Sequence, residues 1–491
     1  MSMTVVSQAR ADVTDQLLDQ LRAKGVLTRG EYSKLKSRHA AEKADMARPY
    51  GRHYSKDGVV VVPDDRYLTR LDKGIGFHIP GLVTKEGEVG AIDVKISGDL
   101  VFGADETFDR HGSATAPIAG GLVTASPNQP YNSIQAGLLP SAVVLSIATN
   151  QMGYDLGFTI GAYTGGNNVS PVGGSNANGP GAPAALGTPG IDLRQVFGTI
   201  GTPTFGTVKI GRDLGLFGSD AILNDATLLG LGSPLTTQSP ANTSLGRIGI
   251  GYVYADWIPQ ITYTTPDFNG FTASISAMTP LNAVNVGGLV GPLQPYSATL
   301  TGQELPMVQG QIKWKGNIAP GAALTVSGDA LWQQHKNDTA TGSLAAMPLE
   351  ATTNSWGVDG FGKLDIDGFS FVAYGYYGQG LGTTGFFFNG FDLAGNARKS
   401  YGGYAQASYT WDKFTFGASW GVSALQATGF DWTVGAAPTL VHDNESIIGF
   451  LRYQLTPWMA LQAEFGHTWT INQLGQNLQE DDLWLGTAWF F

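Results

Sequence analysis

Sixteen short segments in which apolar and polar residues alternate occupy most of this chain. A period of two indicates a β-strand, because successive side chains of a strand point to opposite faces of the sheet. The segments lie at residues 91–103, 141–149, 155–164, 191–199, 206–212, 257–265, 270–278, 305–315, 321–334, 354–365, 368–380, 399–411, 413–425, 442–455, 458–471 and 479–491. The pattern predicts an all-β protein of about 16 antiparallel strands, with 18 as the alternative count.

The connections between these segments alternate in length. Tight turns such as "NQMGY", "PDFN" and "LTPW" are each followed by a longer stretch rich in Gly, Asn and Pro. A meander with short turns at one end and long loops at the other is typical of a transmembrane β-barrel of the outer-membrane type. Closing the sheet also removes unpaired strand edges, which lipid cannot hydrogen-bond. A soluble β-sandwich, the alternative, seldom has so many long strands with such unequal turns.

The segment at residues 413–425 indicates which face meets which solvent. Its apolar residues alternate with small or polar ones, and the two sets are Phe414, Phe416, Ala418, Trp420 and Val422 against Thr415, Gly417, Ser419, Gly421 and Ser423. A barrel of this size has an interior too wide for side chains to fill, so we expect the small polar set to face water in the lumen. The aromatic set is then expected to face lipid.

Composition excludes several other classes. Only 14% of the 491 residues are charged, against about 25% in soluble globular domains, yet no apolar run reaches the roughly 18 residues of a spanning helix. The chain contains no cysteine, so it has neither a disulfide framework nor a thiolate metal site. No metal or cofactor is expected. Residues 91–491 carry 28 acidic and 14 basic side chains, the opposite of the basic surface that binds nucleic acid.

The first 90 residues differ from the rest. Residues 1–11 end in the small-x-small pattern Ala9-Arg10-Ala11 and are interpreted as the remnant of a signal peptide, with a disordered start as the alternative. Residues 12–48 carry apolar stripes at helical spacing and are expected to form two short periplasmic helices. Such helices gain stability by packing on copies of themselves as a coiled coil, and a solvated helix is the alternative. Residues 49–90 are expected to be a linker.

Two longer stretches resemble the general diffusion porins of Gram-negative outer membranes. In "DLRQVFGTIGTPTFGTVKIGRD", residues 192–213, an Arg-Gln-aromatic strand turns into a Phe-Gly-x-Val-x-x-Gly-Arg strand, as in the fourth and fifth strands of that family. "ITYTTPDFNGFTASIS", residues 261–276, resembles the family's next hairpin, and "GFHIPG", residues 76–81, resembles the start of alphaproteobacterial porins. The resemblance covers residues 75–491. The helical prefix departs from it and looks like those of phosphate-selective and coiled-coil-bearing porins.

The resemblance implies a channel for passive diffusion of small hydrophilic solutes, narrowed by an external loop that folds into the barrel. Here that constriction loop spans residues 213–256, and Ser219 is expected to cap a short helix over residues 220–229. The pore-constriction candidates are the loop carboxylates and the basic residues that alternation turns inward or places nearby, namely Asp213, Asp220, Asp225, Lys95, Arg194, Lys209, Lys313, Arg212 and Arg452. Opposed charges would create a transverse field with weak selectivity that leans to cations.

The resemblance also implies partners. Porins of this kind are homotrimers in contact with outer-membrane lipid and lipopolysaccharide, and the terminal Phe491 matches the signal that the barrel-assembly machinery reads. The N-terminal helices are a further candidate for binding peptidoglycan. Two other functions stay open: a phosphate- or anion-selective porin, and an envelope tether whose barrel serves only as an anchor.

Signals of enzymatic activity are weak. "GASWG", residues 417–421, fits the G-x-S-x-G nucleophile motif, but Ser419 is expected in mid-strand rather than on a strand-to-helix turn. "GQGLG", residues 378–382, lacks the following helix that would bind a phosphate. "HDNE", residues 442–445, has cation-binding residue types, although a solvated loop end is the simpler interpretation. We therefore predict that the chain is not an enzyme, with an outer-membrane hydrolase as the alternative.

Overall fold

The computed structural model describes residues 91–123, 131–137, 141–164, 191–230, 244–284, 297–338 and 346–491, with scattered positions among residues 21–36 and 54–89 and at residue 232. The chain divides into two compact units, Met1–His53 and Tyr54–Phe491. In the first unit, most described positions between Leu21 and Lys36 are helical. The signal-peptide remnant predicted at residues 1–11 lies outside the described residues.

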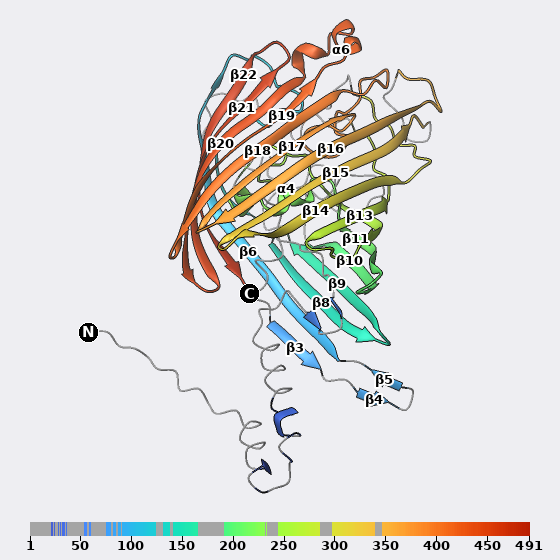
Figure 1. The fold of residues 1–491 in the computed structure, drawn as a ribbon. Helices are drawn as coiled ribbons and strands as arrows, with labels where there is room; N and C mark the ends of the chain where they lie inside the picture. The colour runs from blue at the N-terminus through green and yellow to red at the C-terminus, as the bar shows by residue number, and fades with distance from the viewer. Residues whose placement is uncertain are drawn as a thin grey trace, which may run out of the picture. The chain divides into compact units, whose positions relative to one another are not determined.

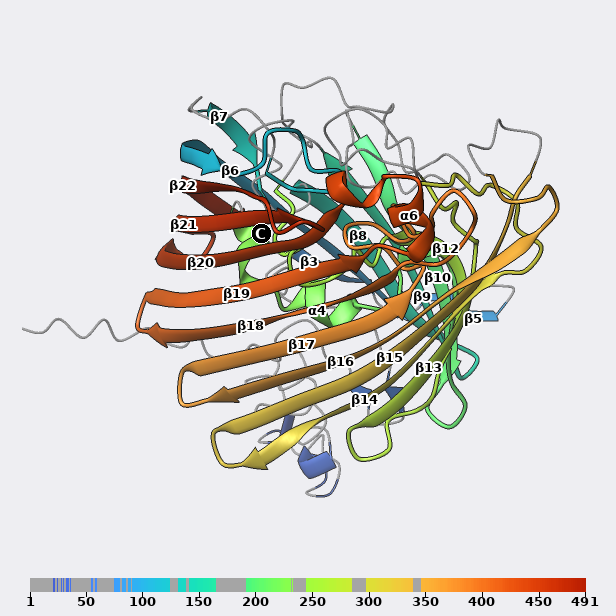
Figure 2. The same cartoon turned by 90° about the horizontal axis from the view of Figure 1, so that it is seen from above.

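The second unit is a closed antiparallel barrel of 16 strands (Figures 1 and 2). The strands are β6 (Ile92–Gly112), β8 (Ser141–Gln151), β9 (Tyr154–Thr164), β10 (Ile191–Thr202), β11 (Gly206–Leu214), β12 (Trp257–Thr264), β13 (Phe271–Met278), β14 (Met307–Ala319), β15 (Ala322–Lys336), β16 (Thr352–Ile366), β17 (Phe369–Gln379), β18 (Lys399–Trp411), β19 (Phe414–Gln426), β20 (Val441–Thr456), β21 (Met459–Asn472) and β22 (Asn477–Phe490). The predicted fold class and strand count are confirmed. Within the described part of the chain, no helix has the length and apolar character needed to cross a membrane.

The barrel closes between its last and first strands. β22 runs antiparallel to β6, in a register that extends from Leu478 opposite Gly112 to Phe490 opposite Asp99. The backbone of Phe491 continues this pairing, because its N–H donates to the carbonyl of Gly98 and its carbonyl accepts from the N–H of Gly98, each at 3.0 Å. Since hydrocarbon offers no hydrogen bonds to a backbone, this seam satisfies two edges that lipid would leave unpaired.

The first strand is longer than the sequence predicts. We placed its end at residue 103, but β6 continues to Gly112. The extra half pairs with β22 along one edge as far as Gly112. On the other edge, β7 (Tyr131–Ala136) pairs with residues 102–107. β7 and β8 follow one another along the same edge of β6 and together act as one interrupted second strand.

The stretch predicted to be a linker, residues 49–90, contributes to the sheet. Its strand β3 (Ile75–Ile79) pairs with residues 92–96 of β6. β22 reaches only as far as Asp99 of β6, so β3 supplies hydrogen bonds to the part of that edge beyond the end of β22. Two small hairpins precede and follow β3: β1 (Tyr54–Ser55) with β2 (Gly58–Val59), and β4 (Leu82–Thr84) with β5 (Gly87–Val89).

Short turns gather at one end of the barrel and most long loops at the other. Met152 and Gly153 have φ values of 53° and 85°, and Asp367 and Gly368 have φ values of 47° and 86°. Two successive positive φ values define the hairpin turn whose twist matches that of the flanking strands. At the opposite end, the β19–β20 loop holds α6 (Gly429–Thr433) and η4 (Ala437–Thr439), while the β21–β22 loop is short, at residues 473–476.

The two faces of β19 follow the predicted alternation. Phe416 and Trp420 are 47% and 44% exposed on the outer wall, whereas Ser419 and Ser423 are at most 1% exposed on the inner side. The inner side is buried because loops pack against it. The wall therefore presents aromatic groups outward and small polar groups inward, as expected for a barrel in lipid.

Deleting Phe491 should reduce the yield of folded barrel. Besides its two hydrogen bonds to Gly98, the Phe491 ring lies 6.2 Å from that of Trp458, so its loss opens the end of the seam. The measurement is the fraction of heat-modifiable, folded protein after expression and after refolding into detergent. Normal folding by both routes would contradict the predicted role of Phe491 as an assembly signal, and a defect in expression alone would identify recognition rather than stability as its role.

Candidate functional site

The loop between β11 and β12 packs against the inner wall of the barrel. It contains α4 (Ser219–Leu223) and η2 (Ala226–Leu229), and Figure 2 shows α4 within the ring of strands. The predicted cap was wrong: Gly218, with a φ of 75°, precedes α4 and offers no side chain, while Ser219 lies inside the helix. The helix is also shorter than predicted, because Asp225 interrupts it and caps η2 instead.

Polar side chains of the wall satisfy the backbone of this loop. The side-chain oxygen of Gln309 in β14 accepts from the N–H groups of Leu216 and Phe217 at 2.7 and 2.9 Å. Asp359 in β16 accepts from the N–H of Gly218 at 2.9 Å. A loop enclosed by a barrel needs such partners, because its N–H and C=O groups have lost water.

The same arrangement continues around the barrel. Gln406 in β18 accepts from the N–H of Ala226 at 2.8 Å. Gln462 in β21 donates to the carbonyl of Leu229 at 2.9 Å. Opposite sides of the wall therefore hold one loop, which fixes its position within the barrel.

Asp225 organises the loop internally. One of its oxygens accepts from the N–H and hydroxyl of Thr227 at 2.8 and 2.7 Å, and the other accepts from the N–H of Arg247 and the hydroxyl of Tyr252, both at 2.7 Å. The residue is 6% exposed. We expected this carboxylate to hang into the lumen; instead it joins the two halves of the loop, because four donors converge on it.

Arg247 fastens the second half of the loop to the wall. Its guanidinium donates to the Ser419 hydroxyl at 3.0 Å and to the Ser446 carbonyl at 3.1 Å, and it also donates to the carbonyl of Ser419. Arg247 is fully buried. The Ser419 of the "GASWG" motif thus lies in mid-strand, as predicted, and contacts a loop arginine from a distance of 172 residues along the chain.

Two of the predicted basic residues each contact one of the predicted acidic residues. Lys209 and Asp213 form an ion pair within β11, and Gln195 donates to the same carboxylate at 3.1 Å. Lys313 on β14 lies 2.8 Å from Asp220 of α4. The structure thus brings these basic and acidic residues together instead of holding them on opposite sides of an open gap.

The other predicted basic residues are spread out. Arg194, near the long-loop end of β10, is buried in an ion pair with Asp192 at 3.1 Å. Lys95 is half-buried near the short-turn end of β6, in register with Ser146 of β8. The structure therefore keeps Lys95 apart from the pairs on β11 and β14, whereas the charge of Arg194 acts on Asp256 of the β11–β12 loop.

Arg452 joins the loop, whereas Arg212 does not share the face of its neighbours. Arg452 donates to Gln462 at 3.1 Å and to the carbonyl of Ala226, the first residue of η2. Arg212 is half-buried and stands in register with Pro259 of β12, one position before the lumen-facing Asp213. Strand alternation places it on the opposite face of the pleat.

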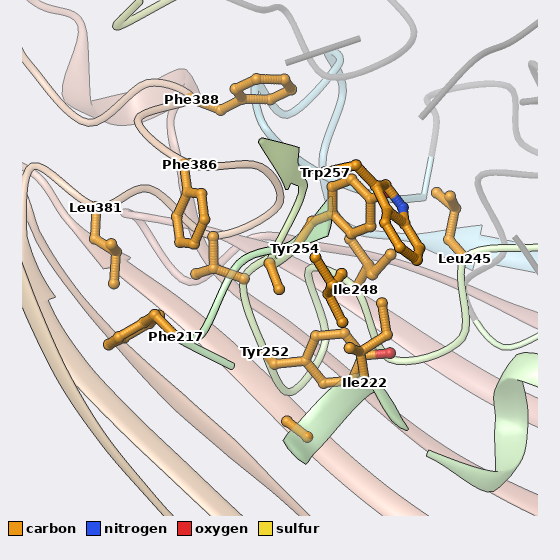
Figure 3. Packing of buried hydrophobic residues seen from close by; sticks show 14 of the residues in the cluster. Phe217, Ile222, Leu245, Ile248, Tyr252, Tyr254, Trp257, Leu381, Phe386 and Phe388 are labelled. Atoms are coloured by element: carbon orange, nitrogen blue, oxygen red, sulfur yellow. The ribbon is translucent and has the colours of Figure 1, made fainter. Parts of the chain in front are cut away.

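Buried apolar side chains fill the space between the loops and the wall (Figure 3). The β11–β12 loop contributes Phe217, Ile222 and Tyr252, and the β17–β18 loop contributes Phe386 and Phe388. The rings of Phe217 and Phe386 lie 6.0 Å apart. Two loops therefore share one apolar core on the inner side of the barrel.

Burial shifts the pKa of several loop groups. Burial lowers the pKa of the Arg247 guanidinium to about 10, against the opposing charges of Asp225 and Glu464, so the group stays protonated at neutral pH. Burial also raises the pKa of Asp256 to about 6, although the Trp257 N–H and the charges of Arg212 and Arg194 counteract it. With a pKa of about 6, the Asp256 carboxyl changes charge between mildly acidic and neutral pH.

Sequence reasoning missed the residues that hold the loop. Arg247 stands alone in the apolar, glycine-rich stretch Leu245–Ala255, and a single charge in such a stretch was the available signal. Gln309, Asp359 and Gln406 occupy inward positions of their strands, but alternation alone does not show what they contact. Among the described residues no group of three or more His, Cys, Asp or Glu could hold a metal ion.

A closed antiparallel barrel of 16 strands is the fold of the Gram-negative outer-membrane porins. Among solved structures, the outer membrane channel DcaP of Acinetobacter baumannii is similar over 84% of this chain and 100% of its own, with a TM-score of 0.58 and 14% identity. At this identity the likeness shows the fold. OmpF of Salmonella typhi aligns more loosely, over 81% of this chain and 98% of its own, with a TM-score of 0.44 and 10% identity. No protein-family model and no curated protein matches the sequence.

Gly421→Ala should displace the β11–β12 loop from the wall. A Cβ at Gly421 would lie 2.2 Å from the carbonyl oxygen of Ile250, a backbone atom that cannot rotate away. The matched control is Gly449→Ala in the neighbouring strand, because nothing lies within 4 Å of a Cβ there. Limited proteolysis and amide hydrogen exchange of residues 244–256 should show faster opening for Gly421→Ala only. Equal behaviour of the two variants would contradict this packing.

Asp256→Asn should remove a pH dependence of the loop. Between the unfolded pKa of about 3.9 and the folded value of about 6, the packed loop holds a proton that the open loop releases, so packing weakens as pH rises through this window. Two units correspond to about 3 kcal/mol. Asn also tolerates the left-handed backbone of Asp256, whose φ is 54°.

The comparison of Asp256→Asn with wild type needs two pH values. At pH 7.5 the variant should exchange its amides in residues 244–256 more slowly than wild type, and at pH 4 the two should exchange alike. A ratio of exchange rates that does not change with pH would show that Asp256 does not titrate in this window.

Proposed function

We propose that this protein is an outer-membrane channel for passive diffusion of small hydrophilic solutes and ions, with no enzymatic activity. The observation that supports this function is the β11–β12 loop, residues 215–256. Its described part is hydrogen-bonded to lumen-side residues such as Gln309, Asp359 and Gln406 of a 16-stranded barrel. A loop held in this way would narrow the water-filled lumen without blocking it. The fold shared with the channel DcaP supports the same proposal.

We propose weak ion selectivity for the constriction. Lys209 with Asp213 and Lys313 with Asp220 are compensated at contact distance, so their fields cancel beyond a few ångströms. The acidic excess of residues 91–491, 28 against 14, would still enrich cations at the mouths at low salt. The remaining charged candidates would contribute little to selectivity. Arg194 is paired with Asp192, and Arg452 and Asp225 are bound within the β11–β12 loop. Lys95 and Arg212 lie outside the constriction.

Location and partners follow from the fold as proposals. The barrel would lie in the outer membrane, in contact with lipid and lipopolysaccharide, and would assemble as a homotrimer with the help of the barrel-assembly machinery. Residues 12–48 would form the periplasmic helical segment, which supports the trimer or binds peptidoglycan. The alphaproteobacterial subtype suggested by residues 76–81 stays a prediction.

A second candidate, an envelope tether with a barrel anchor, is favoured by the apolar core that fills space inside the barrel. Single-channel recording of the purified protein in planar bilayers separates the two. A channel should give stepwise conductance at low and high salt. The absence of steps, from protein shown to be folded by heat modifiability, would support the tether and overturn the diffusion channel.

Asp220→Asn should shift the reversal potential toward anions. Removing this carboxylate leaves the ammonium of Lys313, 20% exposed, without its partner at 2.8 Å. The measurement is the reversal potential across a KCl gradient at low and high salt, and the shift should shrink at high salt because of screening. Asp365→Asn is the control, since Asp365 pairs with Lys363 nearer the short-turn end. A strong anion preference of the wild type at every salt concentration would instead identify an anion-selective porin.

A further inference from the structure

The loop between β17 and β18, residues 380–398, carries four buried phenylalanines. They are Phe386, Phe387, Phe388 and Phe391, none more than 6% exposed. Figure 3 shows Phe386 near Leu381 and above Phe217 of the β11–β12 loop. Exposing large aromatic side chains to water is unfavourable. The burial of these four rings therefore indicates that the loop is held in one position.

That position is on the inner wall, beside β15 and β16. The His335 ring of β15 contacts Phe387 and Phe391, with ring centroids 4.6 and 5.1 Å apart. The Ser355 hydroxyl of β16 donates to the carbonyl of Gly380 at 3.1 Å. Gly357 of β16 leaves room for Leu381, which a Cβ would meet at 3.0 Å.

The β17–β18 loop is also joined to the β11–β12 loop. The N–H of Tyr254 donates to the carbonyl of Thr384 at 2.9 Å, and the rings of Phe217 and Phe386 are 6.0 Å apart. A change in the position of one loop therefore reaches the other through backbone and aromatic contacts.

Arg398 holds the base of this loop. Its guanidinium donates to both oxygens of Asp431 in α6, at 2.9 and 2.6 Å, and to the Ser297 hydroxyl and the Asn389 carbonyl at 2.7 and 2.8 Å. The side chains of Arg398 and Asp431 are at most 1% exposed. One buried cation thus ties together three external loops.

Asp431 is suited to this contact. Burial alone would raise the pKa of its carboxyl, but the hydrogen bonds and charge of Arg398 and the N–H of Thr428 hold the pKa below its usual value. Thr428 forms a capping box with Asp431 and also donates to Asp392 of the β17–β18 loop at 2.6 Å. The ion pair is therefore intact at neutral pH and braced from both sides.

We propose that the β17–β18 loop is a second constriction element and that Arg398, through Asp431, is the positioning residue that keeps its phenylalanines in the lumen. The inference rests on the proposed diffusion channel. Loss of the Arg398–Asp431 contact lets the β17–β18 loop leave the wall and widens the path. The β11–β12 loop loses its contacts to Thr384 and Phe386 but keeps its own attachments through Asp225 and Arg247.

The test compares single-channel conductance and the entry of sugars of increasing size into liposomes. Asp431→Asn and Arg398→Met should raise the conductance and admit larger sugars. The matched control is Lys399→Met, which removes an exposed cation from the next position and should leave both unchanged. Wild-type conductance in both base variants, with amide exchange showing residues 380–398 released, would overturn the proposal.

A disulfide provides a readout that a merely structural role would not change. The chain has no cysteine. Ser297 in the β13–β14 loop and Asp392 in the β17–β18 loop are partners in an isolated antiparallel β-bridge. Adding Ser297→Cys and Asp392→Cys to Asp431→Asn should restore the low conductance when oxidised and lose it again on reduction. No difference between the oxidised and reduced forms would count against Arg398 as a positioning residue.

A further variant leaves the base intact in case the others fold poorly. Phe387→Ala with Phe391→Ala removes two ring contacts to His335 on the wall. The β17–β18 loop should then be held less tightly, so the conductance should rise. Unchanged conductance in this variant would overturn the second constriction. If neither wild type nor any variant conducts, the diffusion channel itself fails, which is a different result from wild-type conductance throughout.

Discussion

Closure of the sheet is the constraint on which the rest of this structure depends. In hydrocarbon each unpaired N–H or C=O is costly, so β22 must find β6, and Phe491 must pair with Gly98 at the last position. The same demand explains β3, which pairs with β6 beyond the end of β22. Once the ring is closed, one face of every strand looks outward to lipid and the other looks into an enclosed space.

That enclosed space is occupied by external loops, and the wall is built to receive them. Glycines such as Gly357 and Gly421 let loop atoms approach the strands. Amides and carboxylates such as Gln309 and Asp359 replace the water that the loop backbone has lost. Buried cations, Arg247 and Arg398, attach the loops at defined points. Polar contacts thus determine where the loops lie, and the shared apolar core stabilises them there.

The candidate site was predictable where the signal is local. Lys209 and Asp213 are four residues apart in one strand, so alternation places them on the same face, and they do form an ion pair. The inward direction of Lys313 was likewise readable from its strand. Ser219 was assigned as a cap because its residue type suits one, but Gly218 is held by Asp359 from a strand 141 residues away. Asp225 was expected to face water in the lumen because its partners are also distant in the sequence. Arg247 and Tyr252 follow 22 and 27 residues later.

The sequence by itself determined most of the strands, their faces and the closed barrel, but not β3, β7 or the second half of β6. These follow from a period of two and from the unequal connections, which are properties of a few neighbouring residues and of the solvent on each side. Only the tertiary structure decided which loops enter the lumen and which charges meet there. Those contacts join residues such as Arg247 and Ser419, 172 positions apart. They become neighbours only because the closed ring brings distant strands to face one another. A local sequence pattern carries no information about such a contact.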